Sequence, residues 1–271
     1  MNSMKTIRFA GAQIPCTPYI ALNTQTIKNA IDWAADNNVN YLVTPEASLS
    51  GYTASITNEV QLLTLALREI ESYAAKKQIG LCLGTLWIED QSTIRNQIRY
   101  YAKDGRYLGA TNKTVLTPLD IQIGVVPSDK LIGIVIPCDS KIIPTAGLIC
   151  ADLYGLQNSN TGGLPNQYCQ LGVTLIIHST NADRGIDSFK DEVEDIWLDG
   201  NLRRISHQII SHIISVDNCY MMDGTEYHGK TATQSGVLIG GKWVTNVLRT
   251  GTQYFYYDFP VDDLILKDPT L

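Results

Sequence analysis

Apolar residues in the N-terminal half occur in two patterns that alternate along the chain. Short apolar runs are typical of buried strands, and they occupy residues 6–14, 40–44 and 79–86. Apolar residues three and four positions apart predict two helices, over residues 24–37 and 60–77, and Asn23 or Thr24 is expected to cap the first. Residues 97–111 predict a hairpin that turns at Asp104-Gly105.

The second half continues this alternation. Further strands are predicted at residues 130–136, 145–150, 173–179, 209–217, 234–239 and 242–247. A short helix is expected before residue 173, and a longer one over residues 188–207. Strands that alternate with helices and include hairpins favour an α/β fold with mixed sheets covered by helices. No linker or low-complexity tract divides the chain, so we expect a single domain over residues 1–271.

The composition of the chain argues against nucleic acids and membranes as partners. Hydrophobic residues make up 44% of the 271 residues, enough for a large buried core. The net charge of −6, from 21 basic and 27 acidic residues, argues against a nucleic-acid partner. No apolar run approaches the roughly 18 residues of a membrane span. The first residues lack the apolar core of a signal peptide, so we expect a cytoplasmic protein that does not bind membranes.

Cysteines and histidines give no metal or disulfide pattern. The six cysteines form no C-x-x-C pair, and they are Cys16, Cys82, Cys138, Cys150, Cys169 and Cys219. Scattered cysteines in a chain of this size are expected to be reduced and mostly buried. His207 and His212 are five positions apart, a poor fit to metal ligands on a helix. We therefore expect no metal site.

Residues 224–231, GTEYHGKT, fit the pattern of a phosphate-binding loop. Such a loop joins a strand to a helix, because the helix N-terminus faces the phosphates. The sequence after Lys230, TATQSGVLIGGKW, is rich in β-branched residues and glycine and predicts a strand with a tight turn. We interpret this stretch as a surface loop rather than a nucleotide site.

Three reactive side chains stand at the ends of predicted strands. Glu46 lies in VTPEASLSGY, Lys113 in GATNKTVLTP and Cys150 in TAGLICADLYG. Alone, each has an ordinary explanation, since charged residues are usually solvated and a cysteine that ends an apolar strand usually belongs to the core. Ligands of mixed α/β sheets, however, commonly bind beyond strand ends.

Together the three residues supply the parts of a thiol hydrolase. A neutral thiol is a weak nucleophile and needs a base, which a buried carboxylate can provide. An ammonium group can stabilise the oxyanion of a tetrahedral intermediate, and the N–H of Ala151 could add a second donor. Cys150, Glu46 and Lys113 therefore cover nucleophile, base and oxyanion stabiliser without a metal or a histidine.

The segments PEASLSGY, NKTVLTP and GLICADLYG, in this order, resemble the motifs of the nitrilase, or carbon–nitrogen hydrolase, superfamily. The resemblance spans roughly residues 6–258. It implies a four-layer α-β-β-α sandwich, self-association into dimers or larger assemblies, and no cofactor. It also implies hydrolysis of a non-peptide C–N bond in a small molecule through a thioester on Cys150, with Glu46 as base and Lys113 as stabiliser.

The chain departs from the superfamily's pattern in two places. Many members carry a second glutamate after the lysine, where the nearest carboxylate here belongs to Asp120, and the sequence leaves open whether its shorter arm takes that place. Leu153 stands where many members have arginine, which weakens the case for an acidic substrate. The residues that we expect to line the substrate pocket are Tyr52, Asp120, Ala151, Tyr154, His178 and Asn181.

The sequence leaves alternatives open. The substrate could be a small amide, a carbamoyl amine, a nitrile or an ω-amide acid, and the acyl group could pass to an amine instead of water. The missing second glutamate also permits a non-catalytic member of the same fold that binds a metabolite or a partner. A cysteine–histidine hydrolase of another fold is a further alternative, but no histidine of this sequence lies within a motif that would support it.

Overall fold

A computed structural model describes residues 5–90, 92–139, 141–154, 163–181, 188–209, 211–220, 224–226 and 228–265, with the backbone alone over residues 188–197. The described strands form two six-stranded sheets. The first has the order β12-β1-β2-β3-β4-β5. Its strands are β1 (Thr6–Gln13), β2 (Tyr41–Val43), β3 (Gly80–Glu89), β4 (Thr93–Tyr101), β5 (Tyr107–Asn112) and β12 (Gln253–Pro260).

The second sheet has the order β11-β10-β9-β8-β7-β6. Its strands are β6 (Gly133–Cys138), β7 (Lys141–Ile149), β8 (Leu175–Thr180), β9 (His212–Asp217), β10 (Gly236–Ile239) and β11 (Lys242–Asn246). Both sheets are mixed. The central strands β1, β2 and β3 run parallel, as do β7, β8 and β9, while the flanking pairs are antiparallel.

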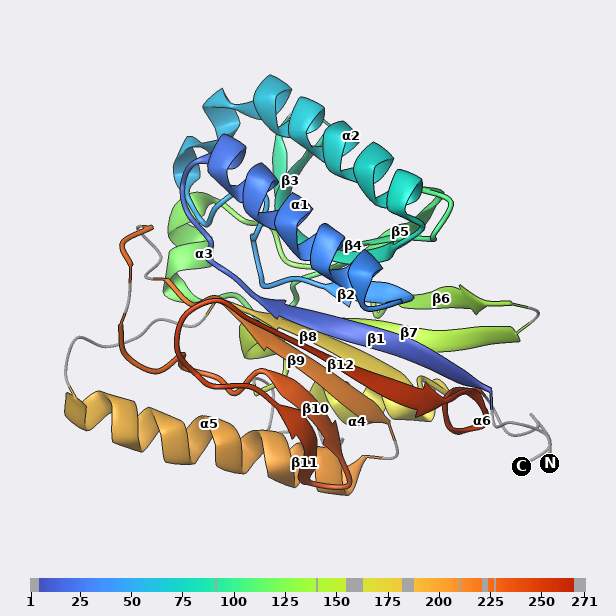
Figure 1. Ribbon diagram of the computed structural model, residues 1–271. Helices are drawn as coiled ribbons and strands as arrows, with labels where there is room; N and C mark the ends of the chain where they lie inside the picture. Colours follow the sequence, from blue (N-terminus) through green and yellow to red (C-terminus); the bar gives the residue numbers. More distant parts are fainter. Residues whose placement is uncertain are drawn as a thin grey trace.

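Helices cover the outer faces of both sheets. The helices of the described residues are α1 (Ile20–Asp36), α2 (Val60–Lys77), α3 (Pro118–Ile123), α4 (Gly163–Gln170), α5 (Ser188–Gln208) and α6 (Val261–Leu264), with short 3₁₀ turns η1 (Ala54–Asn58) and η2 (Cys150–Asp152). The short α6 packs into the layer between the sheets instead of covering an outer face. In Figure 1, α1 and α2 lie over the first sheet, and α4 and α5 lie on the far side of the second. This arrangement confirms the predicted four-layer α-β-β-α sandwich. No helix in the described part of the chain is long and apolar enough to cross a membrane.

Three apolar layers hold these elements together. Ile27, Leu67 and Leu81 belong to the layer between the α1–α2 pair and the first sheet. Phe9, Val43, Ile98, Ile177 and Ile214 lie between the sheets, and Leu148, Leu164, Ile176, Leu202 and Ile213 lie beneath α4 and α5. Ile176 and Ile177 face opposite layers because successive strand residues point to opposite sides. Burial on both faces explains the apolar run over residues 175–177 at the start of β8.

The predicted start of the first helix is wrong. The helix begins at Ile20, and no side chain caps it at Tyr19. Thr24 lies inside the helix and donates to the carbonyl of Ile20, while the Asn23 side chain accepts from the N–H and hydroxyl of Thr17. Asn23 thus fastens the preceding loop instead of capping the helix. In the second half, the strand predicted at 130–136 lies slightly later, at Gly133–Cys138, and both α3 and β12 were not predicted.

The phosphate-loop pattern does not lead into a helix. Of residues 224–231, the structure describes all but 227, and the first regular element after Lys230 is β10. Arg249 donates to the carbonyl oxygens of Thr231 and Ala232, which ties this loop to the chain after β11. The context that a phosphate site needs is therefore missing, as the sequence indicated.

Gly84 allows β3 to approach the segment that carries Glu46. A side-chain carbon at Gly84 would overlap the carbonyl of Pro45 and press on the Glu46 backbone. We expect Gly84→Ala to lower the free energy of unfolding by about 2–3 kcal/mol, because this backbone cannot easily withdraw. Gly200→Ala in α5, where no atom lies within 4 Å of the new carbon, should instead stabilise by about 0.5–1 kcal/mol. Urea unfolding measures both, and an unchanged midpoint for Gly84→Ala would contradict the packing described.

Candidate active site

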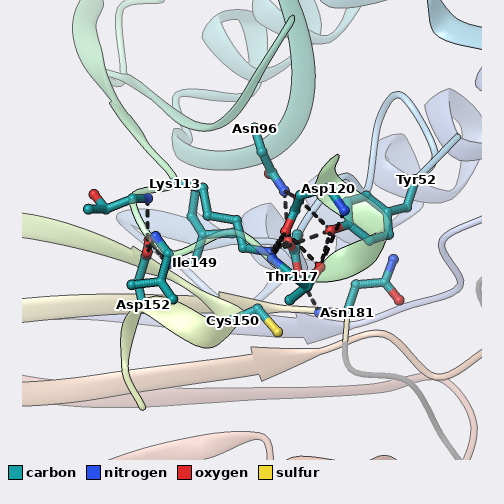
Figure 2. A network of polar contacts seen from close by, with 12 residues as sticks. Tyr52, Asn96, Lys113, Thr117, Asp120, Ile149, Cys150, Asp152 and Asn181 are labelled. Carbon is teal, nitrogen blue, oxygen red and sulfur yellow. Dashed lines mark hydrogen bonds and ion pairs between the residues drawn. The ribbon is translucent and has the colours of Figure 1, made fainter. Parts of the chain in front are cut away.

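The three predicted reactive residues meet where strands of both sheets end. Glu46 follows β2, Lys113 follows β5 and Cys150 follows β7. The Lys113 ammonium lies 2.8 Å from Glu46 Oε1, and both side chains are 0% exposed. Figure 2 shows Cys150 beside the Lys113 side chain. The charges of Lys113 and Glu46 both shift the pKa of the Cys150 thiol. The fold thus gathers the three residues into one cluster, in which Glu46 and Lys113 are buried and Cys150 is partly buried.

Glu46 is held through both of its oxygens. Oε1 accepts from Lys113 and, at 2.7 Å, from the Asn96 side-chain amide. Oε2 accepts from the backbone N–H of Asn181 at 2.9 Å. Burial raises the pKa of Glu46, and nearby Asp120 adds to this effect while Lys113 opposes it. The raised pKa suits a carboxylate that accepts and returns a proton.

Asp120 reaches the cluster despite its short side chain. Its Oδ2 lies 2.7 Å from the Lys113 ammonium. Helix α3 makes this possible, because Thr117 caps the helix and Asp120 occupies its third position in a capping box. The Tyr52 hydroxyl donates to Asp120 Oδ1 at 2.5 Å. The sequence left open whether the shorter arm reaches the site, and the start of the helix carries Asp120 inward to Lys113.

The carboxylates of Glu46 and Asp120 face one ammonium, and their pKa values are shifted in opposite directions. Burial alone would raise the pKa of Asp120, but Lys113 and the bonds from Tyr52 and Thr117 hold it below its usual range. Burial alone would lower the pKa of Lys113, but the charge of Glu46 and its other neighbours raise it. Lys113 and Asp120 consequently remain an ion pair near neutral pH, while Glu46 is the member able to exchange a proton.

Cys150 sits at a sharp bend between a strand and a turn. It opens the η2 turn with φ at +47°, a left-handed conformation that is uncommon for residues other than glycine. Burial and, to a smaller extent, the charge of Glu46 raise the pKa of its thiol to about 12, although the charge of Lys113 acts in the opposite direction. The thiol is therefore protonated near neutral pH, and its reaction as a nucleophile requires a neighbouring base.

Asp152 ties the segments of Lys113 and Cys150 together. Its Oδ1 accepts from the N–H groups of Thr114 and Val115 at 2.9 and 2.6 Å, and its Oδ2 accepts from Ile149 at 3.0 Å. One carboxylate thus joins the residue after Lys113 to the residue before Cys150 (Figure 2). Burial raises the pKa of Asp152 to about 6 while the three N–H donors oppose the rise, so the group is ionised near pH 7.

The expected pocket residues occupy different positions around this centre. Tyr52 belongs to the ion cluster, and Ala151 follows Cys150 in the η2 turn. Tyr154 packs edge-on against His178, with ring centroids 5.8 Å apart. Asn181 gives its backbone N–H to Glu46, while its side-chain amide bonds to Cys16 and Asn218.

His178 contacts the main chain of the cysteine. Its Nε2 donates to the carbonyl oxygen of Cys150 at 3.4 Å, and its Nδ1 accepts from the Ser215 hydroxyl at 2.9 Å. Burial lowers the pKa of His178 to about 4, so the ring is neutral near pH 7. Leu153 packs into the apolar layer beneath α4 and α5 and does not replace the arginine in a polar role.

Sequence reasoning missed Asn96, a polar residue that contacts both carboxylates. It donates to Glu46 and, more weakly at 3.4 Å, to Asp120. The available signal was its place on β4 between Ile94 and Ile98, since alternate strand residues share a face and an asparagine among them is unusual. All six cysteines are described, and none of them forms a disulfide. The described residues contain no group of three His, Cys, Asp or Glu side chains arranged to hold a metal ion, and a metal-free reaction stays a prediction.

Comparison with known proteins identifies the family. The family model described as Carbon-nitrogen hydrolase matches residues 8–161, more than half of the chain. The chain belongs to the carbon–nitrogen hydrolase family. No curated protein sequence shows a significant match.

Solved structures of an amidase from Nesterenkonia sp. share the fold. The crystal structure of that amidase has a TM-score of 0.76 at 17% identity and covers 97% of this chain and 93% of its own. A mutant in complex with butyramide gives a TM-score of 0.74 at 17% identity, with 95% and 92% covered. Another mutant, with the acetamide moiety of fluoroacetamide covalently added at its active site cysteine, gives 0.75 at 16% identity, with the same coverage. At this identity the likeness establishes the fold.

The buried His178 predicts a loss of stability in acid. Its pKa is 6.5 in the unfolded chain and about 4 in the folded one, so between these values only the unfolded chain takes up the proton. Stability therefore falls as the pH drops through this window, by about 2 kcal/mol between pH 7 and pH 4.5. Urea unfolding of His178→Gln should lack this part of the pH dependence.

The matched control for that experiment is His228→Gln, because the His228 side chain is 84% exposed. Subtracting each variant's pH dependence from that of the parent removes the contributions of all other groups. Equal slopes for the parent and His178→Gln would show that the folded protein protonates His178 readily.

Proposed function

We propose that this protein hydrolyses a non-peptide C–N bond in a small amide, carbamoyl amine or nitrile, with Cys150 as nucleophile. The observation that carries the proposal is the fully buried Glu46–Lys113 pair, 2.8 Å apart, beside a cysteine at a strained strand end. Membership of the carbon–nitrogen hydrolase family supports the reaction class. The complex of the Nesterenkonia amidase with butyramide supports simple aliphatic amides as the first substrates to try.

In the first half of the reaction, Glu46 accepts the proton of the Cys150 thiol, and the sulfur attacks the amide carbon. The electron pair of the C=O bond moves to oxygen, and Lys113 and the N–H of Ala151 stabilise the resulting negative charge. When the tetrahedral intermediate collapses, the C–N bond breaks and Glu46 returns the proton to the departing nitrogen. Ammonia or an amine leaves, and the acyl group remains as a thioester on Cys150.

In the second half, Glu46 removes a proton from water, which attacks the thioester carbon. The C–S bond breaks, the thiolate recovers its proton from Glu46, and a carboxylic acid leaves. For an amide the net reaction consumes one water and needs no oxidant or cofactor. For a nitrile the thiol adds across the C≡N bond, and one further water replaces the nitrogen as ammonia to give the same thioester, so the net reaction consumes two waters. An amine in place of the water that attacks the thioester would give acyl transfer by the same steps.

The unequal carboxylates fit these roles. The high thiol pKa means that a base is required, and Glu46 has the raised pKa that such a base needs. Asp120 stays ionised beside Lys113 and so keeps the ammonium charged throughout the cycle. The non-catalytic alternative was based on the missing second glutamate. Because the carboxylate of Asp120 contacts Lys113, the absence of that glutamate no longer favours this alternative. Self-association, a cytoplasmic location and a one-domain organisation remain predictions.

Ammonia release from a panel of small amides, carbamoyl compounds and nitriles tests the proposal. Cys150→Ala should reduce turnover to background while circular dichroism shows an intact fold. Glu46→Gln should lower kcat by about 10²- to 10⁴-fold, the usual contribution of a general base. Intact mass should show an acyl adduct on Cys150 in the parent protein.

The control is Cys138→Ala, because Cys138 ends β6 and lies beside the start of β2, away from the cluster. It should retain the parent rate. Full activity of Cys150→Ala would refute the assignment. Silence across the whole panel, with Cys150 no more reactive toward a thiol probe than Cys82 or Cys169, would favour the metabolite-binding alternative.

A further inference from the structure

A buried polar network lies behind Glu46, on the side away from Lys113. It consists of Cys16 after β1, Asn181 after β8 and Asn218 after β9, all almost completely buried. We propose that Cys16 and Asn218 are positioning residues that hold the Asn181 N–H on Glu46 and so fix the orientation of the general base. This inference rests on the proposed function and adds two residues that the reaction scheme does not use.

The contact that the network would control is the bond from Asn181 to Glu46. Glu46 Oε1 has two donors, whereas the donor found on Oε2 is the Asn181 N–H. That N–H comes from the second sheet, while Glu46 follows a strand of the first. The orientation of the carboxylate therefore depends on where the chain after β8 is held.

Both ends of the Asn181 side chain are fixed. Its Oδ1 accepts from Asn218 Nδ2 at 2.7 Å, and its Nδ2 donates to the Cys16 sulfur at 3.3 Å. Asn218 is fixed in turn, because its Oδ1 accepts from the N–H groups of Cys16 and Tyr220. Buried networks whose polar groups have partners are rigid, so Asn181 has little freedom to turn away from Glu46.

The Cys16 thiol also holds the chain on the other side of Glu46. It donates to the carbonyl oxygen of Ala47 at 3.1 Å while it accepts from Asn181. Ala47 directly follows Glu46 and has φ at +54°, a conformation that costs energy for alanine and persists only where its surroundings hold it. One thiol therefore contacts the backbone next to the base and the residue that donates to the base.

The contacts of the network distinguish the residues that position Glu46 from those that interact with its charge or exchange protons with it. Cys16 and Asn218 reach the base through Asn181 and Ala47, whereas Lys113, Asp120, Tyr52 and Cys150 are the titratable groups that interact with Glu46 itself. Loosening the network should leave those groups in place and weaken the bond to Oε2. The carboxylate would then lose a donor, which favours its protonated form.

Asn218→Ala and Cys16→Ala test this role, with ammonia release measured across pH. We expect kcat to fall about 10- to 100-fold through misplacement of the base. KM should change by less than about 3-fold, because the network does not reach the substrate. The acid limb of the pH–rate profile should move to higher pH. Cys16→Ser, whose hydroxyl can also donate and accept, should restore most of the rate and the profile.

Cys82→Ala is the matched control, since Cys82 is a fully buried thiol in the layer between the sheets. It should keep the parent kcat and pH profile. Circular dichroism checks folding, and if Asn218→Ala misfolds, the pair Cys16→Ala and Cys16→Ser decides. An unmoved acid limb in folded variants would overturn the inference, even if kcat were lower, because loss of folded protein alone does not shift that limb.

Alkylation of Cys150 by iodoacetamide, followed by peptide mass mapping, separates this inference from the proposed function. Faster alkylation of Cys150 than of Cys82 in the parent, with a slower rate in Asn218→Ala, supports both. A reactive Cys150 that Asn218→Ala leaves unchanged overturns the network's role and keeps the proposed function. A parent protein with an unreactive Cys150 and no turnover overturns both.

Discussion

The buried ammonium of Lys113, shared by two carboxylates, is the interaction on which the rest of the site depends. Ions removed from water are stable only when partners and hydrogen bonds replace the lost solvation, and removing one partner of such a pair costs roughly 3–5 kcal/mol. Asp120 and Glu46 lie 2.7 and 2.8 Å from the ammonium, and Asn96, Tyr52 and the Asn181 N–H satisfy the remaining carboxylate oxygen positions. The pKa values of the two carboxylates then differ, because the hydrogen bonds and the ion pair of Asp120 keep it ionised while burial makes Glu46 hold a proton more readily.

The architecture serves this cluster by bringing strand ends from two sheets together. Glu46 and Lys113 follow strands of the first sheet, while Cys150 and Asn181 follow strands of the second. The apolar layer between the sheets holds the two sheets together, but apolar attraction has no direction and does not aim individual side chains. Asp152 fixes the position of Lys113 relative to Cys150 locally, by joining the residue after Lys113 to the residue before Cys150. The strained backbone at Cys150 persists within this frame, which presents the thiol at the bend of the chain.

Much of this could be predicted from the sequence, because it depends on local pattern. The apolar run of β8 and the spaced apolar residues of α2 indicated the layers, and reactive residues at strand ends indicated the site. The reach of Asp120 could not be predicted, since it depends on the capped start of α3, a six-residue helix with little apolar periodicity. Asn96 and Asn218 were missed as functional residues because their importance lies in contacts between distant segments. The start of α1 was misplaced because Asn23, a typical capping residue, bonds to Thr17 instead.

The division of charge between the two carboxylates is the central claim, and carboxyl ¹³C NMR over pH measures it most directly. Cys150→Ala protein labelled at Asp and Glu side chains removes the thiol from the titration, and Asp120→Asn and Glu46→Gln in that background assign the two signals. The account predicts that Asp120 titrates below the usual range of an aspartate and Glu46 above that of a glutamate. A Glu46 that stays ionised while Asp120 takes up the proton first would contradict it.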